Sequence, residues 1–270
     1  MVVRFFDWVQ LYFHTLRHLK LAQVVGRIHF RLRKIRPDLR PPPEVCCPSL
    51  GWQMPAARRP SMLSPTRFCF LNETRDIPAP SYWQSAELQK LWLYNLHYFD
   101  CLNEENAEGR DRWHRNFIGR WIAENPPCFG IGWESYPLSL RIVNWIKWAL
   151  AGNALDEHAR HLLAVQGRFL ASRLERHLLG NHLFSNAKAL VFVGCYFDGD
   201  EASGWLRLGM QILENEVPEQ ILADGGHFER STMYHALAYE DMLDLVNLAT
   251  AYPERLEPWR VSLSSWPVII

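Results

Sequence analysis

The sequence predicts an all-α fold built of consecutive antiparallel helix hairpins, and three observations support this prediction. From Ser81 onward, apolar residues recur at the helical period in each segment. Proline and glycine mark several of the segment ends. No alternation of strands with helices occurs, which argues against a parallel sheet. The 270 residues suffice for one large domain, or for one domain with an ordered arm.

The N-terminal segment, residues 1–36, predicts one or two basic helices. Apolar residues such as Phe5, Val9 and Phe13 recur at helical spacing, with Arg and Lys between them. Residues 1–40 carry nine Lys/Arg and two Asp/Glu, although the whole chain has 29 of each. We expect this arm to pack against its own domain with its arginines in solvent. The alternative is a basic amphipathic helix that makes peripheral contact with a membrane surface.

Residues 37–66 predict an extended linker, because they hold eight prolines, including Pro41-Pro42-Pro43, and proline at this density stops helices. Residues 67–80 are expected to hold a short strand or a piece of a hairpin. The sequence therefore divides into an N-terminal arm with its linker at 1–80 and a helical domain at 81–270.

Seven helices are expected after residue 80. Pro137 stands where a first-turn proline belongs, and Gly152 stands where a helix stop belongs. Asp156 is expected to cap the next helix and Gly180 to end it. The expected helices cover about 84–102, 110–124, 137–151, 156–178, 183–196, 201–216 and 231–250.

Composition and motifs exclude several classes of protein. The six cysteines form no C-x-x-C pair, so we expect reduced thiols and no structural zinc. No apolar run reaches membrane-spanning length, and residues 1–10 do not resemble a secretory signal, which favours a cytoplasmic location. Zero net charge gives no global field for nucleic acid. The P-loop, G-x-G-x-x-G, G-x-S-x-G and H-E-x-x-H motifs are absent from the sequence.

Three polar, glycine-bearing segments lie at or just before expected helix N-termini and are the candidate functional regions. They are residues 130–137, 180–186 and 224–235. Loops at one end of a helical array gather into one mouth, so these segments can form one site. Each also has a plainer explanation: Asn181 as a helix cap, His182 as an interior histidine, and residues 224–226 as a turn. Most of the 12 tryptophans are expected in the core.

Two of these segments resemble the heparinase II/III family of polysaccharide lyases. The resemblance rests on Gly180-Asn181-His182-Leu183-Phe184 and on Asp224-Gly225-Gly226-His227-Phe228-Glu229, followed after four residues by Tyr234-His235. Residues 133–137, with Arg141 and Trp145, are similar to the bacterial branch linked to surface-polysaccharide synthesis. The resemblance covers roughly residues 80–250. It implies an incomplete (α/α) toroid, followed in the family by a C-terminal β-sandwich, with the substrate in the groove between them.

The resemblance also implies a chemistry, which is β-elimination across a uronic acid of an anionic polysaccharide, without a cofactor or a metal. Asn181 would neutralise the uronate carboxylate, with His182 beside it, and Tyr234 would act as base, as acid toward the leaving oxygen, or as both. The family analogy favours a periplasmic location. The residues expected to bind substrate are Trp133, Glu134, Arg141, His227, Glu229 and His235.

Two departures from the family and two rival functions complete the expectations. The first departure is that the family's further catalytic histidine lies in the C-terminal domain, while residues 261–270 do not resemble the family's continuation. The second is the missing signal peptide, since the best-known lyases of the family are exported. We therefore expect a truncated or frame-shifted form, or a domain excerpt, with little or no activity alone. One rival is an (α/α)-barrel glycoside hydrolase using carboxylates from Glu134, Asp224 and Glu229. The other is a non-catalytic carbohydrate-binding protein in surface-polysaccharide assembly.

Overall fold

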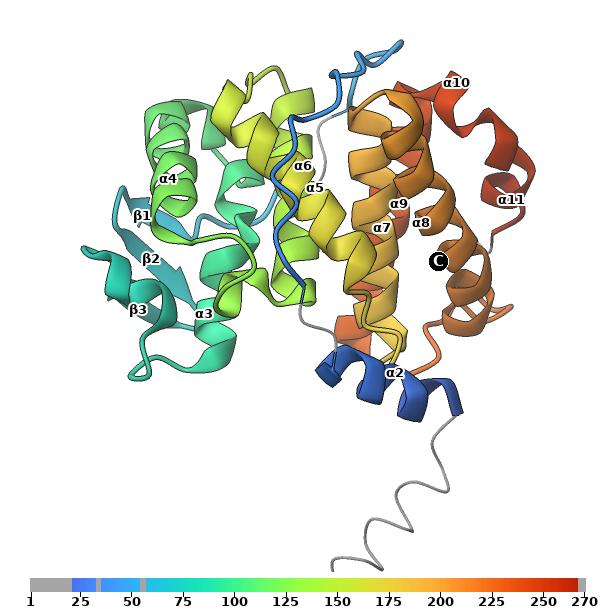
Figure 1. The fold of residues 1–270 in the computed structure, drawn as a ribbon, viewed down its shortest axis with the longest axis horizontal. Coiled ribbons are helices and arrows are strands. Elements are labelled where there is room, and N and C mark those ends of the chain that lie inside the picture. Colours follow the sequence, from blue (N-terminus) through green and yellow to red (C-terminus); the bar gives the residue numbers. More distant parts are fainter. Residues whose placement is uncertain (1–20, 33–34, 54–56, 267–270) are drawn as a thin grey trace, which may run out of the picture.

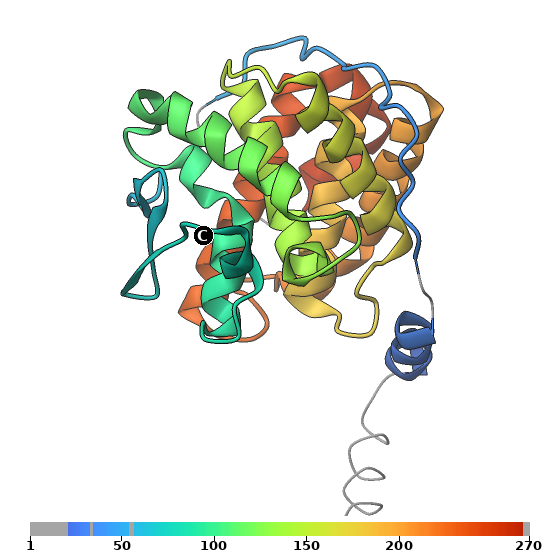
Figure 2. The same cartoon turned by 60° about the vertical axis from the view of Figure 1, so that its left-hand side comes forward.

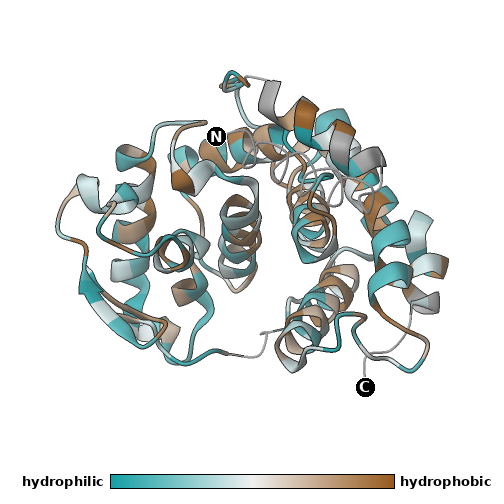
Figure 3. Cartoon of the chain, turned by 90° about the horizontal axis from the view of Figure 1, so that it is seen from below, coloured by the Kyte–Doolittle hydropathy of each residue, from teal (hydrophilic) through white to brown (hydrophobic). Residues whose placement is uncertain are grey.

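Helices make up most of the chain, and the predicted mostly helical, incomplete toroid is confirmed (Figure 1). The computed structural model describes residues 21–32, 35–53 and 57–266. Seen from below, several helices are viewed end on along a curved row (Figure 3). The helices after residue 80 are α3 (Lys90–Tyr98), α4 (Asp111–Glu124), α5 (Ser135–Leu150), α6 (Glu157–Ser172), α7 (Gly180–Tyr196), α8 (Gly199–Gln220), α9 (Thr232–Ala251), α10 (Pro253–Leu256) and α11 (Arg260–Ser265).

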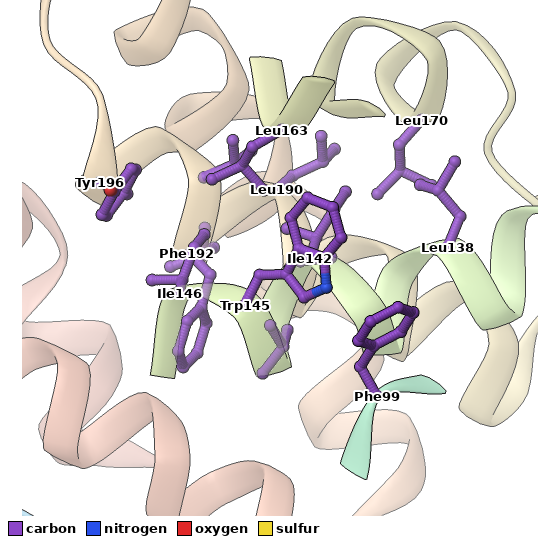
Figure 4. Close-up of a cluster of buried hydrophobic side chains, with 14 of the residues drawn as sticks. Phe99, Leu138, Ile142, Trp145, Ile146, Leu163, Leu170, Leu190, Phe192 and Tyr196 are labelled. Carbon is purple, nitrogen blue, oxygen red and sulfur yellow. The ribbon is translucent and has the colours of Figure 1, made fainter. Parts of the chain in front are cut away.

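The main core lies between α5, α6 and α7. Figure 4 shows Ile142 and Trp145 of α5 in one cluster with Leu163 of α6 and Leu190 of α7, and all four side chains are fully buried. The Trp145 ring also meets the ring of Phe99 edge on at 5.6 Å. The expected core role of the tryptophans holds for most of them, because large aromatic side chains gain the most from leaving water. This core fixes the helices whose N-termini carry the candidate site.

The pair α7 and α8 packs more closely than any large side chain would allow. A β-carbon on Gly194 would lie 2.6 Å from the backbone nitrogen of Leu206. A β-carbon on Gly209 would lie 2.7 Å from the carbonyl oxygen of Ala187. Because backbone atoms cannot give way as a flexible side chain does, both positions require glycine.

We expect Gly194→Ala to lower the free energy of unfolding by about 1–3 kcal/mol, the usual cost of overpacking. Gly204→Ala is the matched control, because Gly204 lies on α8 with open space around a built β-carbon. The control should raise stability by roughly 0.5–1 kcal/mol, the advantage of alanine over glycine in a helix. Urea unfolding measures the free energy of unfolding of both variants. Equal values for Gly194→Ala and the unaltered chain would show that α7 and α8 can move apart without loss of stability.

The boundaries of α6 follow the sequence signals at its start but not at its end. Asp156 caps α6, accepting a hydrogen bond from the backbone nitrogen of Ala159 at 2.8 Å. The prediction that Gly180 ends this helix is wrong, since α6 ends at Ser172 and Gly180 begins α7. The reason is a buried side chain: Oδ1 of Asn186 accepts from the backbone nitrogen of Glu175 at 2.8 Å and folds residues 173–179 into a turn.

The single helix expected at 84–102 is divided into three shorter pieces. A 3-10 turn at Pro80–Gln84 precedes α3, and another at Asp100–Asn103 follows it. Phe99 separates the last two pieces with a left-handed backbone, φ 62°. Its ring is buried 4.4 Å from the ring of Phe117, so core packing overrides the helical period here.

A small antiparallel sheet covers the segment at 67–80 where a strand or hairpin was expected, and its first strand lies within the predicted linker at 37–66. Its strands are β1 (Met62–Ser64), β2 (Arg67–Phe70) and β3 (Glu73–Asp76), in that order. Phe68 is fully buried against Phe117 of α4, with ring centroids 4.8 Å apart. The sheet therefore shares the core of the helices, while the division of the chain at residue 80 stays a prediction.

The described part of the arm packs on the helical domain. Helix α2 (Leu21–Leu32) leads into an extended segment that runs along α6 (Figures 1 and 2). Arg168 of α6 donates to the carbonyl oxygens of Arg40 at 2.6 Å and of Pro41 at 2.9 Å. Residues 1–20 lie outside the described part, so membrane contact by the arm stays a prediction. Among the described helices, none is both long and apolar enough to span a bilayer.

A buried histidine links α3 to α4 and to the turn at Pro80–Gln84. Nδ1 of His97 accepts a hydrogen bond from Nε1 of Trp121 at 2.9 Å, so Nε2 carries the proton and donates to the carbonyl of Trp83 at 3.1 Å. Burial, with the nearby Arg141, lowers the pKa of His97 to about 3. Protonation would place a second donor against the Trp121 N–H, and the folded state therefore holds this imidazole neutral.

We expect the free energy of unfolding to fall as the pH drops below about 6.5. The unfolded chain then protonates His97 while the folded chain does not until about pH 3. This one group costs about 2 kcal/mol of stability by pH 5. His97→Gln keeps an acceptor for Trp121 and a donor for Trp83, and should flatten the loss between pH 7 and 5. His158→Gln, on the exposed face of α6, is the control. Urea unfolding measures the free energy of unfolding of each variant at several pH values. The same pH dependence for His97→Gln as for the unaltered chain would contradict this assignment.

Candidate active site

One cleft of about 440 Å³ brings together the two sequence segments that predicted a site. It lies at the N-termini of α7 and α9, beside α3 and α5. Asn181, His182 and Tyr234 all line it, although Tyr234 is 53 residues further along the chain than Asn181. The other lining residues used below are Arg58, Tyr94, Tyr98, Asp100, Tyr136, Lys147, Lys188, His227, Glu240, Asp241 and Asp244.

The turn before α7 sets the position of Asn181. Leu179 and Gly180 both have a positive φ, of 60° and 56°. Such a conformation costs a non-glycine residue about 1–3 kcal/mol, so the surroundings must hold it. The buried Asn186 holds this turn through two hydrogen bonds to Glu175. Its Oδ1 accepts from the Glu175 backbone nitrogen, and its Nδ2 donates to Oε2 of Glu175 at 3.2 Å. The alternative that Asn181 is the helix cap is wrong, because α7 begins at Gly180 and Asn181 lies in its first turn.

His182 is held between a carboxylate and an aromatic ring. Its Nδ1 lies 3.3 Å from Oε2 of Glu175, an ion-pair distance without hydrogen-bond geometry. Its ring lies 4.4 Å from the ring of Tyr136. Burial, followed by the carboxylates of Asp241 and Asp100, raises the pKa of Tyr136 to about 12. Tyr136 therefore stays protonated and is available as a hydrogen-bond donor.

A tight turn positions Tyr234 on the other side of the cleft. Oδ1 of Asp224 accepts from the backbone nitrogen of Gly226 at 2.9 Å, and Ile221 pairs with His227 in an antiparallel bridge. The His227 ring stacks on the Tyr234 ring at 6.1 Å and 25°. Burial lowers the pKa of His227, which favours the neutral ring beside the phenol. Tyr234 lies in the first turn of α9.

Paired charges form the floor of the cleft. Nζ of Lys188 lies 2.7 Å from Oδ1 of Asp241 and 2.6 Å from Oδ2 of Asp244, and Lys147 also reaches Asp244 at 3.0 Å. Burial alone lowers the pKa of Lys188, but the two carboxylates outweigh it and raise the pKa. Burial also raises the pKa of Asp241, and Lys188 offsets part of that effect.

This floor ties the helices of the site together. Lys188 lies two turns after Asn181 on α7, and Asp241 lies two turns after Tyr234 on α9. At the cleft edge, Arg58 pairs with Asp100 and Glu240, both at 2.7 Å. Each lysine or arginine among the described lining residues is thus already paired with a carboxylate.

The prediction that Arg141 lies on the cleft wall is wrong. Its side chain is fully buried, with its guanidinium 3.8 Å from the centre of the Trp121 ring. It donates to Oε1 of Gln166 at 2.8 Å, and to the carbonyls of Gly132 at 2.8 Å and His97 at 3.2 Å. His97 lies in the last turn of α3 and Gly132 in the 3-10 turn at Ile131–Trp133, where carbonyls lack helical partners, so the arginine serves the fold. The alternative pairing of Arg141 with Glu134 is wrong as well.

Trp133 and Glu134 also lie outside the cleft. Trp133 is a core residue, 3% exposed, with its ring 5.4 Å from Phe169. Glu134 accepts from Lys90 at 2.9 Å and from the hydroxyl of Tyr94. Both residues line a second pocket beside the cleft. Their assignment to the cleft wall is therefore corrected.

Among the other expected substrate-binding residues, His227 lines the cleft, while Glu229 and His235 do not. Glu229 is exposed beside Gly180, and His235 is half-buried on α9. Asp224 is exposed in its turn, so the three carboxylates of the hydrolase alternative do not gather in the cleft. Within the described residues, no cluster of three or more His, Cys, Asp or Glu has the arrangement of a metal site.

Sequence analysis did not single out Lys188, Asp241 or Asp244, which line the cleft, and it included Tyr136 only as part of the candidate segment 130–137. One signal was available for the lysine. Lys188 is the single charged residue in an otherwise apolar run of α7, between Ala187 and Ala189, and a buried lysine needs a partner. Its partners lie more than 50 residues away, so periodicity alone cannot name them.

Comparison with known proteins gives a family match to the region that holds both cleft segments. The family model described as Heparinase II/III N-terminus matches residues 143–257. That region, from the middle of α5 to α10, is similar to the heparinase II/III N-terminal family. The heparin-sulfate lyase of Bacteroides stercoris is 30% identical over 104 residues, which cover 38% of this chain and 15% of the relative. That of Bacteroides thetaiotaomicron is 40% identical over 73 residues, covering 27% and 10%.

Two solved structures share the fold over nearly the whole chain. Heparinase III matches with a TM-score of 0.55 and 21% identity, covering 93% of this chain and 43% of that one. The heparan sulfate lyase HepC of Pedobacter heparinus matches with a TM-score of 0.52 and 19% identity, covering 90% and 43%. The chain thus spans less than half the length of these structures, and its aligned parts span at most 15% of the two curated relatives named above.

Proposed function

We propose that this chain carries the helical part of a polysaccharide lyase site, which cleaves a uronate-containing polysaccharide by β-elimination. The observation that carries the proposal is the meeting of Asn181, His182 and Tyr234 in one cleft, at the first turns of α7 and α9. The relatives named as heparin-sulfate lyases support a substrate in which uronate alternates with hexosamine. The cellular location, cytoplasmic by sequence or periplasmic by analogy, stays a prediction.

The first chemical step in this proposal is removal of the C5 proton of the uronate. Loss of this proton builds negative charge on a group that is already anionic, so the carboxylate must be neutralised by hydrogen bonds. The amide of Asn181 donates to the carboxylate, with His182 beside it. Tyr234 takes the proton, and the positive end of α9 stabilises its phenolate.

The second step is departure of the 4-linked sugar. The electron pair from the C5–H bond forms the C4–C5 double bond, and the C4–O bond breaks. The leaving oxygen takes a proton from Tyr234, which returns the site to its starting state without consuming water. The stacked His227 keeps the Tyr234 ring in place during both steps.

The products distinguish this proposal from its rivals. Heparan sulfate, alginate and bacterial capsule extracts are incubated with the chain, and unsaturated uronate is followed by its near-ultraviolet absorbance. A lyase produces this absorbance together with new reducing ends. A hydrolase produces reducing ends alone, and that result would overturn the proposal. Because the helical part alone is expected to have little or no activity, the assay uses high protein concentration and long incubation.

A further inference from the structure

A second pocket lies beside the cleft, with a volume of about 730 Å³. Phe30 at the end of α2 and Ile35 after it form one wall, so the N-terminal arm contributes to it. The loops that precede α5 and α7 form the other walls. The lining residues that matter here are Phe30, Lys90, Tyr94, Glu134, Arg173, Glu175, His177 and His182.

This pocket adjoins the cleft. Tyr94 and His182 line both cavities. Glu134 faces the second pocket and accepts from the hydroxyl of Tyr94, while Glu175 contacts Nδ1 of His182 at 3.3 Å. A polysaccharide chain seated against His182 in the cleft therefore meets the second pocket at its next sugar.

The lining suits an uncharged sugar. Glu134 and Glu175 are balanced by Lys90 and Arg173, and Lys90 already binds Glu134 at 2.9 Å. Glu134 keeps 40% of its side chain exposed, so its carboxylate has room to accept hydrogen bonds from sugar hydroxyls. A sulfate or a second carboxylate here would face two carboxylates as well as the two cations, so the pocket offers it no net positive charge. Phe30 and Ile35 offer apolar surface to the C–H face of a pyranose.

We propose that the second pocket is a subsite for an uncharged pyranose, the sugar next to the uronate in the same polysaccharide chain. This inference rests on the proposed function, because the cleft must hold the uronate. It also gives the arm a role: α2 closes the subsite through Phe30, whose ring lies 4.5 Å from His177 and 3.9 Å from the guanidinium of Arg173.

Calorimetric titration of the 270-residue chain with glucuronate and with the disaccharide of glucuronate and N-acetylglucosamine tests the subsite. The disaccharide should bind about 5–10-fold more tightly than glucuronate alone, as expected for one additional buried sugar (~1–1.4 kcal/mol). Phe30→Ala and Glu134→Gln should each reduce this gain to less than about twofold. Phe30→Ala should leave the affinity for glucuronate unchanged. Ile28→Ala, on the exposed side of α2, is the matched control and should keep the gain.

The outcomes separate the two proposals. If both lengths bind but Phe30→Ala and Glu134→Gln keep the full gain, the second pocket is not a subsite, while the proposed function stands. The same conclusion follows if a disaccharide with sulfated hexosamine shows an equal gain. If neither length binds, the proposed function fails and this inference fails with it.

Discussion

Tyr234→Phe is expected to lower the rate of unsaturated-uronate formation by at least about 10²–10⁴, the usual contribution of a positioned acid or base. Phenylalanine keeps the ring that stacks on His227 and removes only the hydroxyl. Substrate affinity and the free energy of unfolding should therefore change little. Asn181→Ala should lower the rate by a similar factor, because the uronate carboxylate loses its donor.

The matched control for this prediction is Tyr239→Phe. Tyr239 lies on the same helix, α9, and is 46% exposed outside the cleft. Removing its hydroxyl should leave the rate unchanged. Equal rates for Tyr234→Phe and Tyr239→Phe would show that Tyr234 transfers no proton.

Lys188→Met is expected to lower the free energy of unfolding by about 3–5 kcal/mol, because it leaves a buried charge without its partner. Asp241 then keeps no lysine, while Asp244 keeps Lys147. Adding Asp241→Leu should restore much of the lost stability, since a well-packed apolar pair often replaces a buried ion pair without loss.

The control for Lys188→Met is Lys90→Met, which removes another lysine–carboxylate pair. Lys90 is 61% exposed and pairs with Glu134 at the surface, so its loss should cost about 0–1 kcal/mol. Denaturant unfolding measures all three variants. Equal losses for Lys188→Met and Lys90→Met would mean that the floor of the cleft adds no particular stability.

The helical fold could be predicted from the sequence because amphipathic period and end signals are local. Asp156 caps its helix as its position indicates. The signals failed where a distant side chain intervenes, as when Asn186 of α7 fixes the turn after α6. The break at Phe99 has the same cause, since Phe117 and Trp145 bury its ring.

The candidate site could be predicted in part. Asn181, His182 and Tyr234 stand in polar segments before or at helix starts, and loop position brings such segments together. The position of Arg141 could not be predicted from the sequence, because a guanidinium group can donate to buried carbonyls as well as to a substrate oxyanion. The partners of Lys188 follow from the packing of α7 against α9, which no local pattern specifies.

The most direct test follows the C5 proton itself. Oligosaccharide substrate carrying deuterium at C5 of the uronate is incubated with the chain, and the products are analysed by mass spectrometry and NMR. β-Elimination predicts that each cleaved uronate loses its deuterium, gains a C4–C5 double bond and is formed more slowly than from the protonated substrate. Cleaved products that keep the C5 deuterium and a saturated ring would contradict the account.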